Sequence, residues 1–288
     1  MKSNLEKSYR TTIHFTPPLE SPMMDLNILM DESSEVYHAK SKDFLSSHAL
    51  IEYIRCPYLY KKRISGLIEE KDSPAYFVGR AAHTRILEGI TAYEAEYAIG
   101  GPINPATGKP FGNTTKKFLE WQEIQQKPVI PFEKAELIEA MNAGVRMNTL
   151  ACELLSHGKA EGVVRSDYRG IPCQIRIDWT HPEYGIVDLK TCDDLDAFET
   201  DTRKYGYKNQ LAFYHAVLKT VAPELPPTVH IIAIEKREPY RCGVWMITDE
   251  TLSDAKAVNE AGIERLKQSR TDENWPTGYE TVRILHQP

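Results

Sequence analysis

The chain has few cysteines, and none of them is close to another in the sequence. The five thiols lie at Cys56, Cys152, Cys173, Cys192 and Cys242, without a C-x-x-C pair. This scatter argues against a disulfide framework, a structural zinc ribbon and a four-cysteine iron–sulfur cluster. We therefore expect reduced and mostly buried thiols.

Long apolar runs and an excess of positive charge are also absent. No stretch approaches the roughly 18–20 apolar residues of a membrane helix, and the polar start MKSNLEKSYR is unlike a signal peptide. The 288 residues carry 35 Lys and Arg against 41 Asp and Glu, a net charge of −6. That balance excludes a broadly basic protein that wraps nucleic acid, but it allows a local basic groove. We expect a cytoplasmic protein with no membrane partner.

The hydrophobic pattern changes from helical to strand-like along the chain. Residues 1–40 are weakly patterned, and we treat 1–25 as a flexible arm. Residues 26–156 favour helices: one capped by Ser46 or Ser47 and stopping before Pro57, then 58–64, 75–88, 115–126 and 133–155, with a loop or lid at 100–115. Residues 157–250 favour strands at 161–168, 171–179, 186–191, 229–235 and 243–247, and a helix at 208–221. A closing helix at 251–268 and a tail complete one expected domain, 26–288.

These patterns predict a mixed α/β fold, with a central, mostly antiparallel or mixed sheet flanked by helices. Arg169-Gly170 indicates a hairpin between the first two strands. Along the second strand, Ile171, Cys173, Ile175 and Ile177 share one face, and Gln174, Arg176 and Asp178 share the other.

An acidic residue and a lysine alternate in the strand IVDLKT. Asp188 and Lys190 share one face, and Val187 and Leu189 share the other. A turn at 181–185 would bring Asp178 opposite Asp188. Two neighbouring carboxylates repel unless a cation or proton lies between them, and carboxylate oxygens are the ligands that Mg²⁺ prefers. The pattern fits metal-assisted phosphodiester hydrolysis, with Lys190 orienting or helping to deprotonate the attacking water. A surface Asp–Lys ion pair would explain the same residues taken alone.

Five segments in order extend this motif. They are GRAAH (79–83), AEGVV (160–164), IRIDW (175–179), IVDLKT (186–191) and YKNQLAFYH (207–215). Together with SSHALIEYIRCPYLYKKRISG upstream, they resemble the RecE-type exonucleases, a RecB-like branch of the PD-(D/E)XK nuclease superfamily, over about residues 41–250. The resemblance implies a restriction-endonuclease-like PD-(D/E)XK core. No proline precedes Asp178 and the second acid is Asp188 rather than a glutamate, and both are normal for the RecB-like variant.

The resemblance also implies roles for individual residues. Asp178, Asp188 and the main-chain carbonyl of Leu189 would bind Mg²⁺, with Mn²⁺ as the alternative ion. Lys190 would hold the nucleophilic water or stabilise the pentavalent phosphate. His83 would be a further metal ligand, and Glu161 another acidic group beside the metal. Gln210 and Tyr214, on one helix face, match a Q-x-x-x-Y motif that supports the site and touches the substrate strand; ordinary packing would explain them, and His83, if each stood alone.

Cations indicate where DNA phosphates could pass. Arg176 shares the face of Asp178, and Arg55 lies near the predicted site. The other runs, 61–63, 116–117 and 203–204, are also compatible with a solvated surface. Phe77, Trp121 and Tyr205 could stack on a strand end, although packing in the core would explain each of them.

The resemblance implies an exonuclease that digests linear double-stranded DNA from the 5′ end and leaves a 3′ overhang. It further implies a homo-oligomeric ring, a trimer or tetramer, a single-strand annealing protein as partner, and a phage or prophage origin in a bacterial host. Two alternatives stay open: an endonuclease on the same fold, and a catalytically inactive DNA-binding or scaffold module. Degenerate modules typically lose an acid or the lysine, whereas Asp178, Asp188 and Lys190 are all present.

Overall fold

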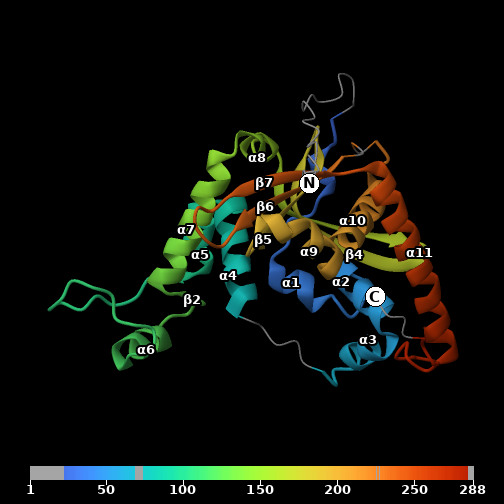
Figure 1. Cartoon of the computed structure of the whole chain (residues 1–288), viewed down its shortest axis with the longest axis horizontal. Helices are drawn as coiled ribbons and strands as arrows, with labels where there is room; N and C mark the ends of the chain where they lie inside the picture. The colour runs from blue at the N-terminus through green and yellow to red at the C-terminus, as the bar shows by residue number, and fades with distance from the viewer. Residues whose placement is uncertain (1–22, 69–73, 225, 227, 285–288) are drawn as a thin grey trace, which may run out of the picture.

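A five-stranded sheet forms the centre of the computed structural model, which describes residues 23–68, 74–224, 226 and 228–284. Its order is β3 (Lys159–Tyr168), β4 (Ile171–His181), β5 (Gly185–Cys192), β6 (Val229–Glu235) and β7 (Cys242–Ile247). Neighbouring strands are antiparallel except β5 and β6, which are parallel. The predicted mixed, mostly antiparallel sheet is therefore confirmed (Figure 1).

Helices cover both faces of this sheet (Figure 1). On one face, α2 (Ser47–Arg55), α10 (Tyr207–Val221) and α11 (Asp249–Asp272) enclose a core that contains Ile186. On the other face, α4 (Pro74–His83), α7 (Phe132–Met147) and α8 (Thr149–Leu154) enclose a core that contains Val187 and Leu189. The alternation predicted for β5 is thus confirmed, and it directs Asp188 and Lys190 to the α10 side of the sheet.

The hairpin between β3 and β4 turns at the predicted dipeptide. Arg169 and Gly170 have φ values of +56° and +73°. Positive φ at both central residues is the type I′ geometry, whose twist matches that of the flanking strands. The turn fixes the register that later places Glu161 opposite Asp178.

Several boundaries differ from those predicted. The expected helix 133–155 is two helices, because the Asn148 side chain accepts a hydrogen bond from the Ala151 N–H and starts α8. The expected helix 75–88 is α-helical only to His83 and continues as a π-helix, η2 (Thr84–Glu88), which ends at Gly89. The connection from β5 to β6 contains an additional helix, α9 (Phe198–Tyr205), after the short η3 (Leu195–Ala197).

The N-terminal segment is more ordered than its sequence pattern indicates. Residues 26–40 form η1 (Leu26–Ile28) and α1 (Ser34–Ala39), and they bury Leu29 and Tyr37. Residues 1–22 of the predicted arm lie outside the described residues, whereas Met24 is buried in the core on the α10 side.

The remaining elements lie at the periphery. They are α3 (Pro57–Ile64), α5 (Ile90–Glu96), α6 (Lys116–Glu123) and a parallel pair, β1 (Ala98–Ile99) with β2 (Val129–Ile130). The segment with the predicted loop and α6 extends away from the sheet (Figure 1). All five cysteines are free thiols, but only Cys173 and Cys192 are buried, so the expectation of mostly buried thiols is wrong. Within the described ranges, no helix is both long enough and apolar enough to cross a lipid bilayer.

Two helical glycines give a test of this packing. A Cβ at Gly144 of α7 would lie 2.4 Å from the Tyr240 carbonyl oxygen, whereas a Cβ at Gly79 of α4 would lie 3.7 Å from Thr191 Oγ1, an ordinary contact. The packing around Gly79 therefore does not require glycine. We expect Gly144→Ala to destabilise the protein by about 1–3 kcal/mol, because the added methyl overpacks a backbone contact. Gly79→Ala should be neutral or stabilising by up to about 1 kcal/mol, because alanine has the higher helix propensity. Urea unfolding measures both, and equal effects would contradict the packing.

Candidate metal centre

The pairing of β3 with β4 is interrupted where two acidic residues face each other. The strands pair regularly on both sides of Glu161 and Asp178, but Glu161 itself has a φ of +54°. A left-handed conformation costs a residue other than glycine about 1–3 kcal/mol and tends to occur at functional sites. On β4, Ile177 lies in the core on the α10 side and Trp179 packs against the opposite core, so the alternation breaks at Asp178. The irregularity changes the direction of both carboxylates.

Asp178 also bridges the gap between β4 and β5. The register of these strands reaches only to Trp179 opposite Val187. Beyond it, Asp178 Oδ2 accepts a hydrogen bond of 2.8 Å from the Leu189 N–H. The carboxylate takes the place of a main-chain acceptor, which satisfies the freed N–H and fixes the side chain.

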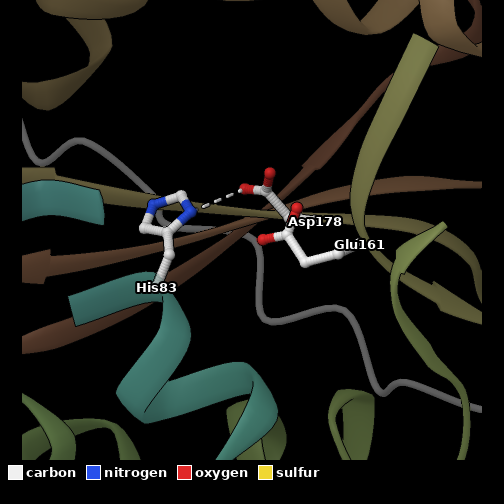
Figure 2. A group of neighbouring side chains, drawn as sticks. All are labelled: His83, Glu161 and Asp178. Atoms are coloured by element: carbon white, nitrogen blue, oxygen red, sulfur yellow. Dashed lines mark ion pairs between the residues drawn. The ribbon is translucent and has the colours of Figure 1, made fainter. Parts of the chain in front are cut away.

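His83 reaches the same point from the end of α4. Its Nδ1 lies 3.5 Å from Asp178 Oδ2, the contact drawn in Figure 2. Immediately after His83 the chain widens into the π-helix η2, a form that often occurs at functional sites. The same turn carries Glu88, whose charge helps to raise the pKa of Glu161.

Together, His83, Glu161 and Asp178 form one group. Each offers a ligand atom, and these atoms all lie within 4.8 Å of one another (Figure 2). Arg176 flanks the group, with its Nε 2.9 Å from Glu161 Oε2. Three of the predicted site residues therefore converge, and Arg176 contacts one of them.

Asp188 and Lys190 lie next to this group but are not part of it. Their ion pair joins Lys190 Nζ to Asp188 Oδ2 at 2.6 Å, with the aspartate side chain only 1% exposed. The other oxygen, Asp188 Oδ1, is buried and has no hydrogen-bond partner among the described residues. The structure thus places Asp188 beside the three residues with one carboxylate oxygen unused.

Burial dominates the electrostatics of these acids. It raises the pKa of Asp178, and with the Asp178 charge it raises the pKa of Glu161 to about 8. Burial also raises the pKa of Asp188 to about 6, against the attraction of Lys190. Three neighbouring acids with raised pKa values would be stabilised in their ionised form by a bound cation.

The pKa values of the two bases of the site, His83 and Lys190, are shifted in opposite directions. Burial and the nearby Lys190 charge lower the pKa of His83 to about 4, so its imidazole is neutral at pH 7 and able to bind a metal. Burial alone would lower the pKa of Lys190, but the Asp188 and Asp178 carboxylates raise it. Lys190 is therefore a fixed cation at neutral pH.

These residues fit a divalent cation. Asp178 and Glu161 supply oxygen ligands, His83 supplies a neutral nitrogen, and Asp188 Oδ1 is a buried acceptor without a partner. Carboxylate oxygens suit Mg²⁺ and Mn²⁺, and an imidazole nitrogen is a ligand commoner for transition metals.

The other predicted residues lie around this centre. Gln210 Nε2 donates to Tyr214 Oη at 3.2 Å, and both side chains are buried on α10. Burial raises the pKa of Tyr214, and the Asp178 and Asp188 charges add to that shift. Leu189 contributes its N–H to Asp178. Arg55, by contrast, donates to the Lys204 carbonyl at 2.6 Å and lies outside the group of metal ligands.

Tyr207 is a residue of the site that the sequence analysis did not single out. Lys190 Nζ lies 4.9 Å from the centre of its ring, which packs the ammonium from the α10 side. Its position in the sequence could have indicated this role, because Tyr207 lies three residues before Gln210 and so about one turn earlier on the same face of α10.

Comparison with known proteins agrees with this geometry. Residues 41–288 match the family described as PDDEXK-like domain of unknown function (DUF3799). The chain belongs to this family. Like other members of the PDDEXK-like group, it has the nuclease-superfamily core that the sequence resemblance implied. The narrower resemblance of this PDDEXK-like chain to RecE-type exonucleases stays a prediction.

A solved structure shows the same fold. The crystal structure of a "Putative exonuclease" from Eubacterium rectale is similar to this PDDEXK-like chain, with a TM-score of 0.65 at 18% sequence identity. The similarity covers 90% of this chain and 96% of that one. A comparison with curated proteins gives no match.

The raised acid pKa values predict how stability depends on pH. Without divalent ions, the folded protein keeps a proton on Glu161 up to about pH 8, whereas the unfolded chain loses it near the ordinary value of 4.5. The contribution of Glu161 to stability in EDTA should therefore fall as the pH rises from 6.5 to 8, by up to about 2 kcal/mol. The buried histidines oppose this fall between pH 6.5 and about 7.5, because their folded pKa values are lowered while the unfolded chain still binds part of their protons there. The Glu161 contribution is therefore the difference between the wild type and Glu161→Gln, in which the histidine contribution cancels.

Thermal unfolding at pH 6.5 and 8 measures this effect. Between these pH values the wild type should lose stability relative to Glu161→Gln, and excess Mg²⁺ or Mn²⁺ should abolish that relative loss, because the cation binds the ionised acids. A wild-type slope that is unchanged by both divalent ions would contradict a metal centre.

Proposed function

We propose that this chain is a divalent-metal-dependent exodeoxyribonuclease that hydrolyses phosphodiester bonds of linear double-stranded DNA. The observation that carries the proposal is the convergence of His83, Glu161 and Asp178 beside the Asp188–Lys190 ion pair, inside a PDDEXK-like domain. We propose Mg²⁺ as the ion, with Mn²⁺ as the alternative.

A bound cation would supply Lewis-acid polarisation of the phosphate and a bound water of lowered pKa. Asp178 and Glu161 would hold the cation through oxygen, with His83 as the nitrogen ligand. Lys190 remains charged at neutral pH, so it stabilises negative charge developing on the phosphate and does not accept the proton of the water. Asp188 fixes the ammonium of Lys190, and with a pKa of about 6 its unpaired Oδ1 is suited to receive that proton.

The finer assignment rests on the sequence resemblance to RecE-type exonucleases. It supports digestion from the 5′ end that leaves a 3′ overhang for recombination by strand annealing, with a single-strand annealing protein as partner. This resemblance assigns roles in the site or its support to Asp178, Asp188, Lys190, Gln210 and Tyr214. Phage or prophage origin belongs to the same proposal.

Two substitutions test the site. Asp188→Ala and Lys190→Ala should each lower the rate of Mg²⁺-dependent nucleotide release by at least about 10²–10³-fold. Lys190→Ala removes the positive charge that faces the reacting phosphate, and Asp188→Ala removes the carboxylate that holds that charge in place. Lys236→Ala is the matched control, since Lys236 pairs with Asp193 at 2.9 Å and the aspartate side chain is 88% exposed. Retained activity in either site variant would place the chemistry elsewhere.

The substrate in that assay distinguishes the alternatives. Linear duplex DNA should be digested and covalently closed circles should resist. Cleavage of the circles would favour an endonuclease on the same fold. A wild-type protein that neither hydrolyses DNA nor binds Mg²⁺ or Mn²⁺ by calorimetry would favour an inactive DNA-binding or scaffold module.

The proposed ring makes a separate prediction. Light scattering at micromolar protein should give the mass of a trimer or tetramer of the 32.8 kDa chain. A monomer throughout that range would rule out the ring and leave the metal centre untouched.

A further inference from the structure

Two lysines and two tyrosines form a continuous stack that begins at the metal centre. Lys190 Nζ lies 4.9 Å from the centre of the Tyr207 ring, and the Tyr207 and Tyr205 rings stack at 5.7 Å with 26° between their planes. Lys204 Nζ lies 5.0 Å from the centre of the Tyr205 ring. We refer to Lys190, Tyr207, Tyr205 and Lys204 as the tyrosine stack.

The tyrosine stack leads from a buried end to an exposed one. The Lys190 side chain is 14% exposed and is held by Asp188, whereas Tyr205 is 49% exposed. These contacts place the Tyr205 ring within about 11 Å of the Lys190 ammonium. That distance corresponds to about three nucleotides of a stacked strand.

The corner between α9 and α10 creates this arrangement. Gly206, between the two helices, has a φ of +75°, a left-handed conformation that glycine adopts without strain. It reverses the chain so that residues 205 and 207 stack on each other. Arg55, from α2, donates to the Lys204 carbonyl at 2.6 Å and holds the end of α9.

Cations also line a surface pocket next to the tyrosine stack. This pocket is lined by Arg55 and Arg203 together with Ile51, Ile54, Gly206, Asn209 and Val258. Lys204 thus lies against the exposed ring, and two arginines line a pocket that reaches Gly206, the residue after Tyr205, in a protein whose net charge is −6. Aromatic rings that stack bases and cations that contact phosphates are the two components of single-strand binding surfaces.

We propose that Tyr205 stacks on an unpaired base of the strand that enters the metal centre, while Arg55 and Arg203 contact its flanking phosphates. The identity of the polymer rests on the proposed function. A base inside a duplex has both faces covered by its neighbours, so an exposed ring accepts only a terminal or unpaired base. The tyrosine stack therefore selects a strand that has separated from its complement before it reaches Lys190.

Binding of a labelled single-stranded DNA 12-mer, followed by fluorescence anisotropy with Ca²⁺ in place of Mg²⁺, tests the proposal without requiring hydrolysis. Tyr205→Ala should weaken binding by about fivefold to a hundredfold, the range for loss of one stacked base. Tyr205→Phe should stay within about twofold of the wild type, because it keeps the ring. Tyr279→Ala is the matched control, an exposed tyrosine of the C-terminal segment at 73% exposure.

An abasic nucleotide, moved along the 12-mer, identifies the base concerned. At one position it should weaken wild-type binding and abolish the difference between the wild type and Tyr205→Ala, because both changes remove the same contact. Tyr205→Ala binding that equals the wild type, or an equal loss in Tyr205→Phe, would overturn the proposal. Wild-type protein that shows Tyr205-dependent binding but no Mg²⁺-dependent hydrolysis would refute the proposed function and leave the strand-binding role standing.

Discussion

The interruption of strand pairing at Glu161 and Asp178 is the constraint on which the site depends. A regular ladder would place these two carboxylates on the same face of the sheet, as ordinary cross-strand neighbours. Here the left-handed Glu161 and the break in alternation at Asp178 place both beside His83. Regular pairing on either side holds the distortion, and the Leu189 N–H and Arg176 offset part of the repulsion between the acids.

Local patterns in the sequence were sufficient for most of the sheet. The five strands were predicted within about two residues at each end, because a period of two and the Arg169-Gly170 turn are readable over short distances. Helix α9 was missed because Phe198 is its only buried residue and gives no apolar periodicity. The break between α7 and α8 was missed because the apolar pattern continues across Asn148. Only the side chain of that one residue, which caps α8, marks the break.

The candidate site also contains features that local sequence patterns predict and features that they do not. Alternation along β5 correctly paired Asp188 with Lys190, since both residues lie on one strand. Glu161 joins the group with Asp178 and His83 through its own left-handed conformation, and Glu88 comes near Glu161 through a π-helical turn. Neither feature leaves a periodic pattern in the sequence. That Asp178 and Asp188 share a metal stays a prediction from the sequence. The structure brings Asp178 together with Glu161 and His83, where Asp178 turns toward the Leu189 N–H beyond the end of the β4–β5 ladder.

The raised pKa values of the clustered acids affect how the metal-free chain folds. With the pKa of Glu161 near 8 and that of Asp188 near 6, these carboxyl groups can bind protons when no cation is bound. The newly made chain can close its core without waiting for an ion, because it need not enclose several bare negative charges. A divalent cation that bound these acids would displace the protons, so its affinity would decrease as the pH falls.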